Sequence, residues 1–178
     1  MQPFIILMAV GTVLLDVAIV LGILGLFRES TKRKIFFLGQ QYGLLAIFIL
    51  STLAVVGTLL MDVGGLSPCL FCWWQRVCMY PVAFISAIAF FKNTKISDVA
   101  DYVIALSVIG ALIALYQHFL QILPAGSLIP CDPAGECAIR SVFEFNFVTI
   151  PWMALTVFAA LIFVAFLART DRSNEISD

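Results

Sequence analysis

Five long apolar segments, separated by short polar stretches, dominate the pattern of this sequence. They cover residues 4–27, 42–61, 73–91 (or 77–91), 102–123 and 148–167. About 20 helical residues cross the hydrocarbon core of a bilayer, and every segment except the shorter third one reaches that length. Because lipid offers no hydrogen bonds, backbone polar groups must be satisfied within helices. The pattern therefore predicts an all-α membrane protein with five transmembrane helices.

Composition agrees with a chain surrounded by a lipid bilayer. Of the 178 residues, 62% are hydrophobic and only 12% are charged, which is too few charges for a water-soluble surface. The net charge of -1 says nothing about nucleic acid, but the sequence holds no basic patch, so we expect no nucleic acid partner.

The basic residues predict the orientation of the five segments. Eight of the ten lie in the first connection, the third connection and the C-terminal tail: Arg28, Lys32, Arg33, Lys34, Lys92, Lys95, Arg169 and Arg172. With five spans these three regions share one side, and the positive-inside rule makes that side cytoplasmic. The N-terminus and the other two loops are then expected outside.

Four cysteines fall in the two loops that are expected outside. Cys69 and Cys72 form a Cys-x-x-Cys pair, and Cys131 and Cys137 follow in the second loop. Disulfides persist on the oxidising side of a membrane and are rare in the cytoplasm. Arg76 lies four residues after Cys72, so a helix that begins early enough would place the two on one face. A nearby cation stabilises a thiolate, which is the reactive form of cysteine.

The residues alone leave several interpretations open. Four thiolates could hold a structural zinc ion, or the loops could simply be stapled by disulfides. Four cysteines allow three connectivities, and the sequence does not choose among them. Arg76 could be an interfacial anchor whose side chain reaches out to water. Cys78, inside the third segment, is interpreted as a core packing residue.

Four motifs carry a resemblance to a known family. They are 68–76 (Pro-Cys-Leu-Phe-Cys-Trp-Trp-Gln-Arg), 116–121 (Tyr-Gln-His-Phe-Leu-Gln), Pro130-Cys131 with Cys137, and Thr149-Ile150-Pro151. With these motifs the chain resembles the DsbB disulfide bond formation proteins, in particular their BdbC-like branch. The resemblance covers residues 40–168 and implies a four-helix transmembrane domain there. Residues 1–39 would add an N-terminal transmembrane helix and a basic cytoplasmic loop, and 169–178 would form a cytoplasmic tail.

The resemblance implies a multi-pass thiol oxidoreductase of the bacterial inner membrane. Such a protein reoxidises a DsbA-like partner, a thioredoxin-fold dithiol oxidase, and passes the electrons to a membrane quinone, either ubiquinone or menaquinone. By position, Cys131 would receive the partner's thiolate and Cys137 would exchange with Cys69. Cys72 would be the thiolate beside the quinone.

The same resemblance implies residues around the quinone ring, and we expect no metal site. Arg76 would donate to a quinone oxygen, since a guanidinium stays protonated. Gln117, His118 and Gln121 are candidate neighbours. His118 lies five residues before Leu123, about 7.5 Å below the expected helix end, which suits a ring just under the interface. A buried histidine with an ordinary hydrogen bond is the alternative interpretation.

Two departures from the family pattern stand out. The first segment is an extra span, and it carries Asp16 near its middle. That carboxyl group could belong to a proton route or to a subunit contact, but we favour a hydrogen bond to a Ser or Thr of a neighbouring helix. The second departure is the short spacing from Cys131 to Cys137. Rival classes are a vitamin K epoxide reductase-like protein, in which the loop pair precedes the Cys-x-x-Cys, and a membrane scaffold with stapled loops.

Overall fold

The computed structural model describes residues 2–66, 68–123, 137, 142–145 and 147–175. Five helices account for nearly all of them: α1 (Gln2–Leu26), α2 (Glu29–Val63), α3 (Leu70–Phe91), α4 (Ile96–Ile122) and α5 (Ile150–Glu175). All five contain a stretch long and apolar enough to cross a membrane. The described part of the chain contains no strand beyond one isolated bridge between Glu144 and Val148. The expected all-α membrane fold is confirmed.

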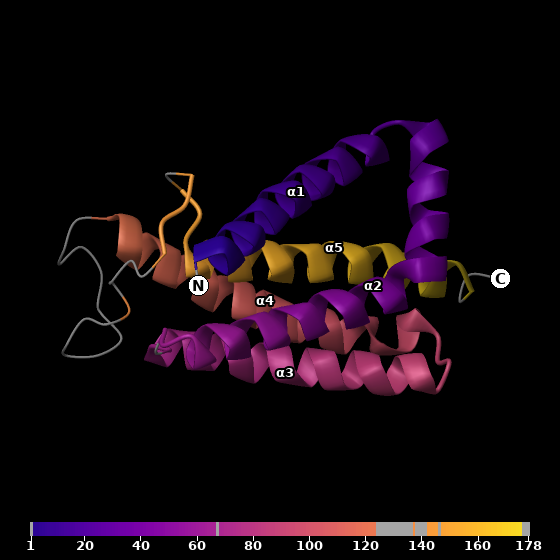
Figure 1. The fold of residues 1–178 in the computed structure, drawn as a ribbon. Helices are drawn as coiled ribbons and strands as arrows, with labels where there is room; N and C mark the ends of the chain where they lie inside the picture. The colour runs from indigo at the N-terminus through magenta and orange to yellow at the C-terminus, as the bar shows by residue number, and fades with distance from the viewer. Residues whose placement is uncertain (1, 67, 124–136, 138–141, 146, 176–178) are drawn as a thin grey trace.

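Helices α2 to α5 form an antiparallel bundle, and α1 leans across it at an angle (Figure 1). The N-terminus, the end of α2 and the start of α3 lie at one end of the bundle, which we call the cysteine end. The α1–α2 connection, the α3–α4 turn and the end of α5 lie at the opposite end. There Arg169 on α5 forms an ion pair with Asp101 on α4, with Nε and Oδ1 3.1 Å apart. The basic connections and tail therefore share one end, as the sequence predicted.

Helix α2 is longer than its apolar segment. Residues Glu29 to Lys34, expected to be a loop, form its first turns instead, and the domain boundary expected at residue 40 falls inside the helix. At 1.5 Å per residue its 35 residues extend about 50 Å, well beyond a hydrocarbon core of about 30 Å. Accordingly, the first part of α2 runs across the end of the bundle before the helix bends to join it (Figure 1).

Helix α3 begins directly after the first cysteine. Cys69 has the extended backbone of an N-cap residue, and the helix runs from Leu70 through Pro81 to Phe91. The third segment was expected to begin at Trp73 or Val77, with the proline near its start. The earlier beginning places Pro81 inside the helix and adds the turn that carries Cys72. Cys72 and Arg76 therefore lie four residues apart on one continuous helix, which is the condition for sharing a face.

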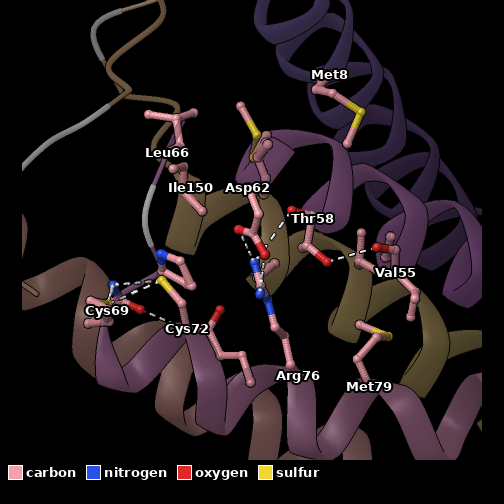
Figure 2. A pocket seen from close by; sticks show the side chains of 18 of the residues that line it. Met8, Val55, Thr58, Asp62, Leu66, Cys69, Cys72, Arg76, Met79 and Ile150 are labelled. Carbon is pink, nitrogen blue, oxygen red and sulfur yellow. Dashed lines mark hydrogen bonds and ion pairs between the residues drawn. The ribbon is translucent and has the colours of Figure 1, made fainter. Parts of the chain in front are cut away.

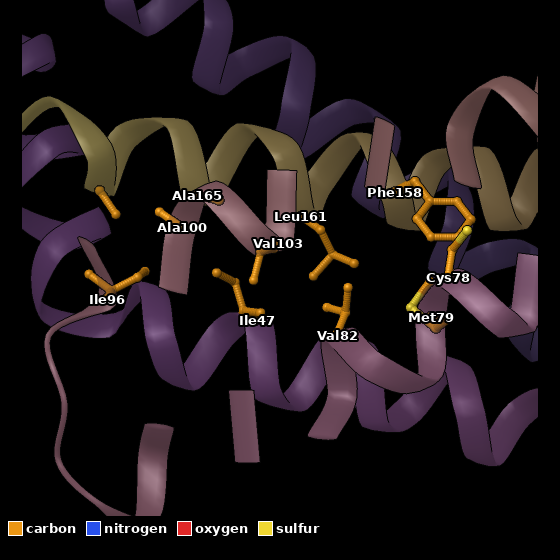
Figure 3. Close-up of a cluster of buried hydrophobic side chains, with 11 residues drawn as sticks. Ile47, Cys78, Met79, Val82, Ile96, Ala100, Val103, Phe158, Leu161 and Ala165 are labelled. Atoms are coloured by element: carbon orange, nitrogen blue, oxygen red, sulfur yellow. The ribbon is translucent and has the colours of Figure 1, made fainter. Parts of the chain in front are cut away.

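The core of the bundle is a cluster of small and branched side chains between α2, α3, α4 and α5 (Figure 3). Phe158 on α5 lies against Gly110 on α4, where no β-carbon could fit beside the ring. Cys78 belongs to this cluster and is 6% exposed, which confirms its interpretation as a packing residue. This core thus holds the four helices together.

Candidate active site: a dithiol and an arginine in one cavity

Cys69 and Cys72 meet at the start of α3 as a pair of free thiols. Their sulfur atoms lie 3.2 Å apart, a hydrogen-bonding distance for thiols. This hydrogen bond raises the pKa of the Cys69 thiol above its ordinary value, and burial and the charge of a Cys72 thiolate act in the same direction. Cys69 therefore keeps the proton of the pair and can donate it toward Cys72. The arrangement suits a disulfide that opens and closes.

Gln117 on α4 joins the two sulfur atoms. Its Nε2 donates to Cys69 Sγ at 3.1 Å and to Cys72 Sγ at 3.7 Å. Gln75 on α3 donates from Nε2 to Gln117 Oε1 at 2.7 Å, which fixes the amide with its NH₂ group toward the sulfurs. Both glutamines are buried. An amide donor held at two sulfurs stabilises negative charge on either one.

Arg76 lies one turn after Cys72 and is held by Asp62 at the end of α2. Nη1 donates to Asp62 Oδ2 at 2.6 Å and Nη2 to Asp62 Oδ1 at 2.7 Å, a bidentate pair (Figure 2). Nη2 also reaches the carbonyl oxygen of Thr58, at 3.4 Å. Arg76 is only 6% exposed, so it does not reach out to water as the anchoring interpretation expected. Its guanidinium carbon also lies 5.1 Å from the ring centroid of Trp73.

One cavity brings these groups together. It has a volume of about 130 Å³ and is bordered by side chains from all five helices, most of them apolar (Figure 2). The polar lining residues are Thr58, Asp62, Cys69, Cys72, Gln75, Arg76, Tyr80, Gln117 and Gln121. The Nε atom of Arg76 is buried and has no hydrogen-bond partner among the residues that the structure describes. A buried donor beside a cavity suits a ligand with an acceptor oxygen, because an unsatisfied donor is costly.

Of the four residues expected around a quinone, three line this cavity: Arg76, Gln117 and Gln121. His118 is placed differently. Its Nδ1 lies 3.0 Å from the hydroxyl oxygen of Thr149, and its ring centroid lies 5.0 Å from that of Trp152. Thr149 also accepts a hydrogen bond from the Trp152 backbone N–H, which caps the start of α5. His118 therefore contacts the beginning of α5 and is not among the residues bordering the cavity.

The second cysteine pair is described only in part. Cys137 is disulfide-bonded and fully buried, and its carbonyl oxygen accepts a hydrogen bond from Gln121 Nε2 at 3.4 Å. Gln121 lies one helical turn after Gln117, so neighbouring glutamines of α4 contact the two cysteine regions. Cys131, the expected entry point for electrons, lies outside the described residues. Within the described part of the chain, no three His, Cys, Asp or Glu side chains lie close enough to hold a metal ion.

The sequence analysis missed two residues of this site, Asp62 and Gln75. Asp62 directly follows the second apolar segment, and no role was predicted for it. Its position near the end of the second segment was the available signal. In two consecutive antiparallel helices, a residue near the end of the first lies at the same membrane depth as one near the start of the second, here Arg76. Gln75 stands between Cys72 and Arg76 in the motif, and its polar side chain beside a buried arginine was a second signal.

A multi-pass membrane bundle that holds a pair of thiols in a helix-lined cavity defines a membrane protein for thiol–disulfide exchange. The family model of the disulfide bond formation protein DsbB matches residues 40–168. The chain belongs to the DsbB family, as the motifs in its sequence indicated.

Curated relatives agree with this assignment. The disulfide bond formation protein C of Bacillus subtilis is 33% identical over 133 residues, which are 74% of this chain and 95% of the relative. A probable disulfide formation protein of Chlamydia pneumoniae is 28% identical over 131 residues, 71% of this chain and 93% of its own. A prophage-derived disulfide bond formation protein B of B. subtilis is 33% identical over 118 residues, 66% and 78% of the two chains. No solved structure gives a significant match.

Proposed function

We propose that this protein is a quinone-linked thiol oxidase of a bacterial cytoplasmic membrane. It reoxidises a DsbA-like dithiol protein outside the cytoplasm and thereby supports disulfide formation in exported proteins. The observation that carries the proposal is the shared cavity, in which the Cys69–Cys72 pair and the unsatisfied Nε of Arg76 border one mostly apolar space. The gathering of basic residues at the end opposite the cysteines supports the orientation.

The cavity suits a quinone head group. A dry cavity of about 150 Å³ is known to hold one benzene ring, so the space here is of the size of a single ring. Arg76 would hold a quinone oxygen from its free Nε, while Asp62 keeps the guanidinium in place. A bound quinone would supply an acceptor for two electrons and two protons, which a dithiol must lose to become a disulfide. The menaquinone and ubiquinone alternatives share this chemistry.

The cysteines take part in four successive thiol–disulfide exchanges in this proposal. A thiolate of the partner attacks Cys131 Sγ, which breaks a Cys131–Cys137 disulfide and releases Cys137 as a thiolate. Cys137 then attacks Cys69 Sγ, the Cys69–Cys72 bond breaks, and Cys72 leaves as a thiolate. The partner's second thiolate displaces Cys131 and closes the partner's own disulfide. Cys131 in turn attacks Cys137, which restores the loop disulfide and releases Cys69 as a thiol.

The buried polar groups assist these exchanges at stated atoms. Cys72 is released next to the Gln117 amide and one turn from Arg76, so both a dipole and a cation stabilise its charge. Cys69 takes up and holds a proton because its pKa is raised. Gln121, one helical turn after Gln117, holds the backbone of Cys137 by a hydrogen bond. This bond supports the exchange between Cys137 and Cys69.

The test is oxidation of a reduced thioredoxin-fold dithiol protein by the purified membrane protein with added quinone. Thiol alkylation followed by a gel shift measures the partner's redox state. We expect catalytic oxidation by the wild type and a loss of at least 100-fold for Cys131→Ser. Cys78→Ala is the matched control, since Cys78 packs in the core and does not line the cavity, and it should keep the wild-type rate.

Other outcomes would contradict the proposal in distinct ways. A normal rate for Cys131→Ser would remove that residue from the entry of electrons. An inactive but folded wild type would favour a scaffold with stapled loops. Zinc bound to the purified protein and lost in Cys69→Ser would support the four-thiolate site.

A further inference from the structure

Helix α1 borders the active-site cavity although it lies outside the family match. The match covers residues 40–168, whereas α1 ends at Leu26. Ile5 and Ala9 are buried in a second apolar cluster, and Met8 packs against it and lines the cavity directly. Three other members of this cluster, Met61, Val142 and Met153, line the cavity as well. The added helix is therefore part of the wall around the site.

Met8 packs against α2 at Gly57. A β-carbon placed on Gly57 would lie 2.8 Å from Met8 Cε, so the end of the methionine side chain occupies the space that a side chain at position 57 would need. Figure 2 shows Met8 reaching from α1 toward the lining residues of α2. Thr58, the residue after Gly57, gives Arg76 its carbonyl contact. The methionine thus lies beside the segment of α2 that holds the arginine.

Asp16 fixes the position of α1 along α5. Its Oδ1 accepts a hydrogen bond from Thr156 Oγ1 at 2.7 Å, and its Oδ2 accepts one from Trp152 Nε1 at 3.1 Å. The bond to Thr156 confirms the expected bond to a Ser or Thr of a neighbouring helix. A carboxyl group at mid-span is costly to insert into a bilayer, so sliding α1 away from these two donors is unfavourable. The buried residues Ile5, Ala9 and Thr12 continue the same face toward the cavity.

We infer that Met8 is a specificity-determining residue that limits the size of the ring bound in the cavity, and that Asp16 is the positioning residue that keeps Met8 there. This inference rests on the proposed quinone site and deepens it. With a volume of about 130 Å³, the cavity leaves little room beyond one ring, so the length of a single wall side chain decides whether a second fused ring fits. The ligand class is a quinone, and Met8 discriminates one-ring from two-ring head groups.

The first test needs no quinone. The reduced protein is treated with a small maleimide (N-ethylmaleimide) and a bulky, lipid-soluble one (N-pyrenylmaleimide), and labelling of Cys72 is followed by peptide mass spectrometry. We expect Met8→Ala to raise the bulky-to-small labelling ratio at least threefold and Met8→Trp to lower it. Leu7→Ala and Leu7→Trp are matched controls, because Leu7 is 68% exposed on the same helix, and they should leave the ratio unchanged.

Asp16 is tested by the same labelling ratio. Asp16→Ala should raise it as Met8→Ala does, since α1 is no longer held against α5. Asp16→Asn keeps an oxygen for the Thr156 hydroxyl and should restore most of the wild-type ratio. A ratio that stays at the wild-type value in Met8→Ala, Met8→Trp and Asp16→Ala would overturn the inference, even if all variants fold.

The second test compares KM for a one-ring benzoquinone with KM for a two-ring naphthoquinone. Met8→Ala should lower the naphthoquinone KM relative to the benzoquinone KM several-fold. Equal KM changes for both quinones would contradict a size limit. Failure of the proposed function is distinguishable, because the wild type would then reduce neither quinone while the labelling ratios still respond to Met8.

Discussion

At the scale of single residues, the sharing of a proton between two sulfurs distinguishes this site from an ordinary pair of thiols. Cys69 and Cys72 lie within hydrogen-bonding distance, and Gln117 donates to both sulfur atoms. The pKa of Cys69 is raised, first by its hydrogen bond with Cys72 and then by burial. The consequence is an asymmetric pair, in which Cys69 stays protonated while Cys72 is the sulfur next to Arg76.

This asymmetry predicts a slow reaction of Cys69 with alkylating agents. A raised pKa means less thiolate at every pH, whereas an ordinary thiol is half ionised near about pH 8.5. Between about pH 7 and pH 9 we expect Cys69 in the reduced protein to react with iodoacetamide well below the rate of a free cysteine. Cys72→Ala removes the main cause of the shift and should speed the reaction. An unchanged rate in that variant would contradict the assigned cause.

Asp62 is the second residue with a clear prediction. Removing one partner of a buried ion pair costs about 3–5 kcal/mol, because the other charge is left uncompensated. Asp62→Ala should therefore lower the thermal stability measured in detergent more than Arg76→Met, which leaves an acid that is 28% exposed. The double variant Asp62→Ala/Arg76→Met should be less destabilised than the sum of the two single variants. Additive losses would show that the pair does not interact.

The same residues show what the sequence could predict about the site. Cys69, Cys72 and Arg76 belong to one continuous stretch, so helical spacing alone brings the last two together. Asp62 comes from another helix, and its pairing depends on the depth at which α2 and α3 cross. His118 was expected near the ring, but a hydroxyl on α5 accounts for the orientation of its side chain. Contacts within a helix follow from spacing, whereas contacts between helices depend on packing.

At the scale of elements, close packing between α4 and α5 positions the site. Gly110 lies directly against the ring of Phe158, which is 1% exposed and belongs to the core. Gln117 and Gln121 lie two and three turns further along α4, so the distance between α4 and α5 also sets the position of both amides.

Gly110→Ala tests this packing. The added methyl group would overlap the Phe158 ring, and overpacking a core costs about 1–3 kcal/mol. We expect a lower melting temperature in detergent. Gly11→Ala on α1 is the matched control, because nothing lies within 4 Å of its added β-carbon and alanine is the better helix former. An equal effect of the two substitutions would mean that α4 and α5 are less tightly packed than described.

Element boundaries illustrate why hydropathy predicted the fold class better than its details. All five apolar segments became helices, because their length and composition leave few alternatives in a membrane. The starts of α2 and α4 were misplaced because polar residues can continue a helix beyond its apolar segment, and the start of α3 was misplaced because the Cys-x-x-Cys stretch was expected in a loop. Glu29 to Lys34 extend α2, and Leu70 to Cys72 extend α3. The second extension matters for function, since it places Cys72 on the same helix as Arg76.

At the scale of the whole molecule, the four helices of the family domain carry both cysteine regions and the arginine, while α1 is added to one side. The cysteine pair and Arg76 border one cavity near the cysteine end, and the connections rich in basic residues lie at the other end. In the proposed function, a soluble dithiol protein would approach one end, while a quinone would arrive from within the bilayer. This separation of donor and acceptor is the central claim about the molecule.

The most direct test of that claim is quinone reduction by the purified protein, driven by a reduced thioredoxin-fold dithiol donor. Wild type and Cys72→Ser are compared with ubiquinone and menaquinone analogues, and the absorbance change of the quinone is recorded. The proposed function predicts turnover by the wild type with at least one analogue and none by Cys72→Ser. A correctly folded wild type that reduces neither quinone, or a Cys72→Ser variant that turns over normally, would contradict it.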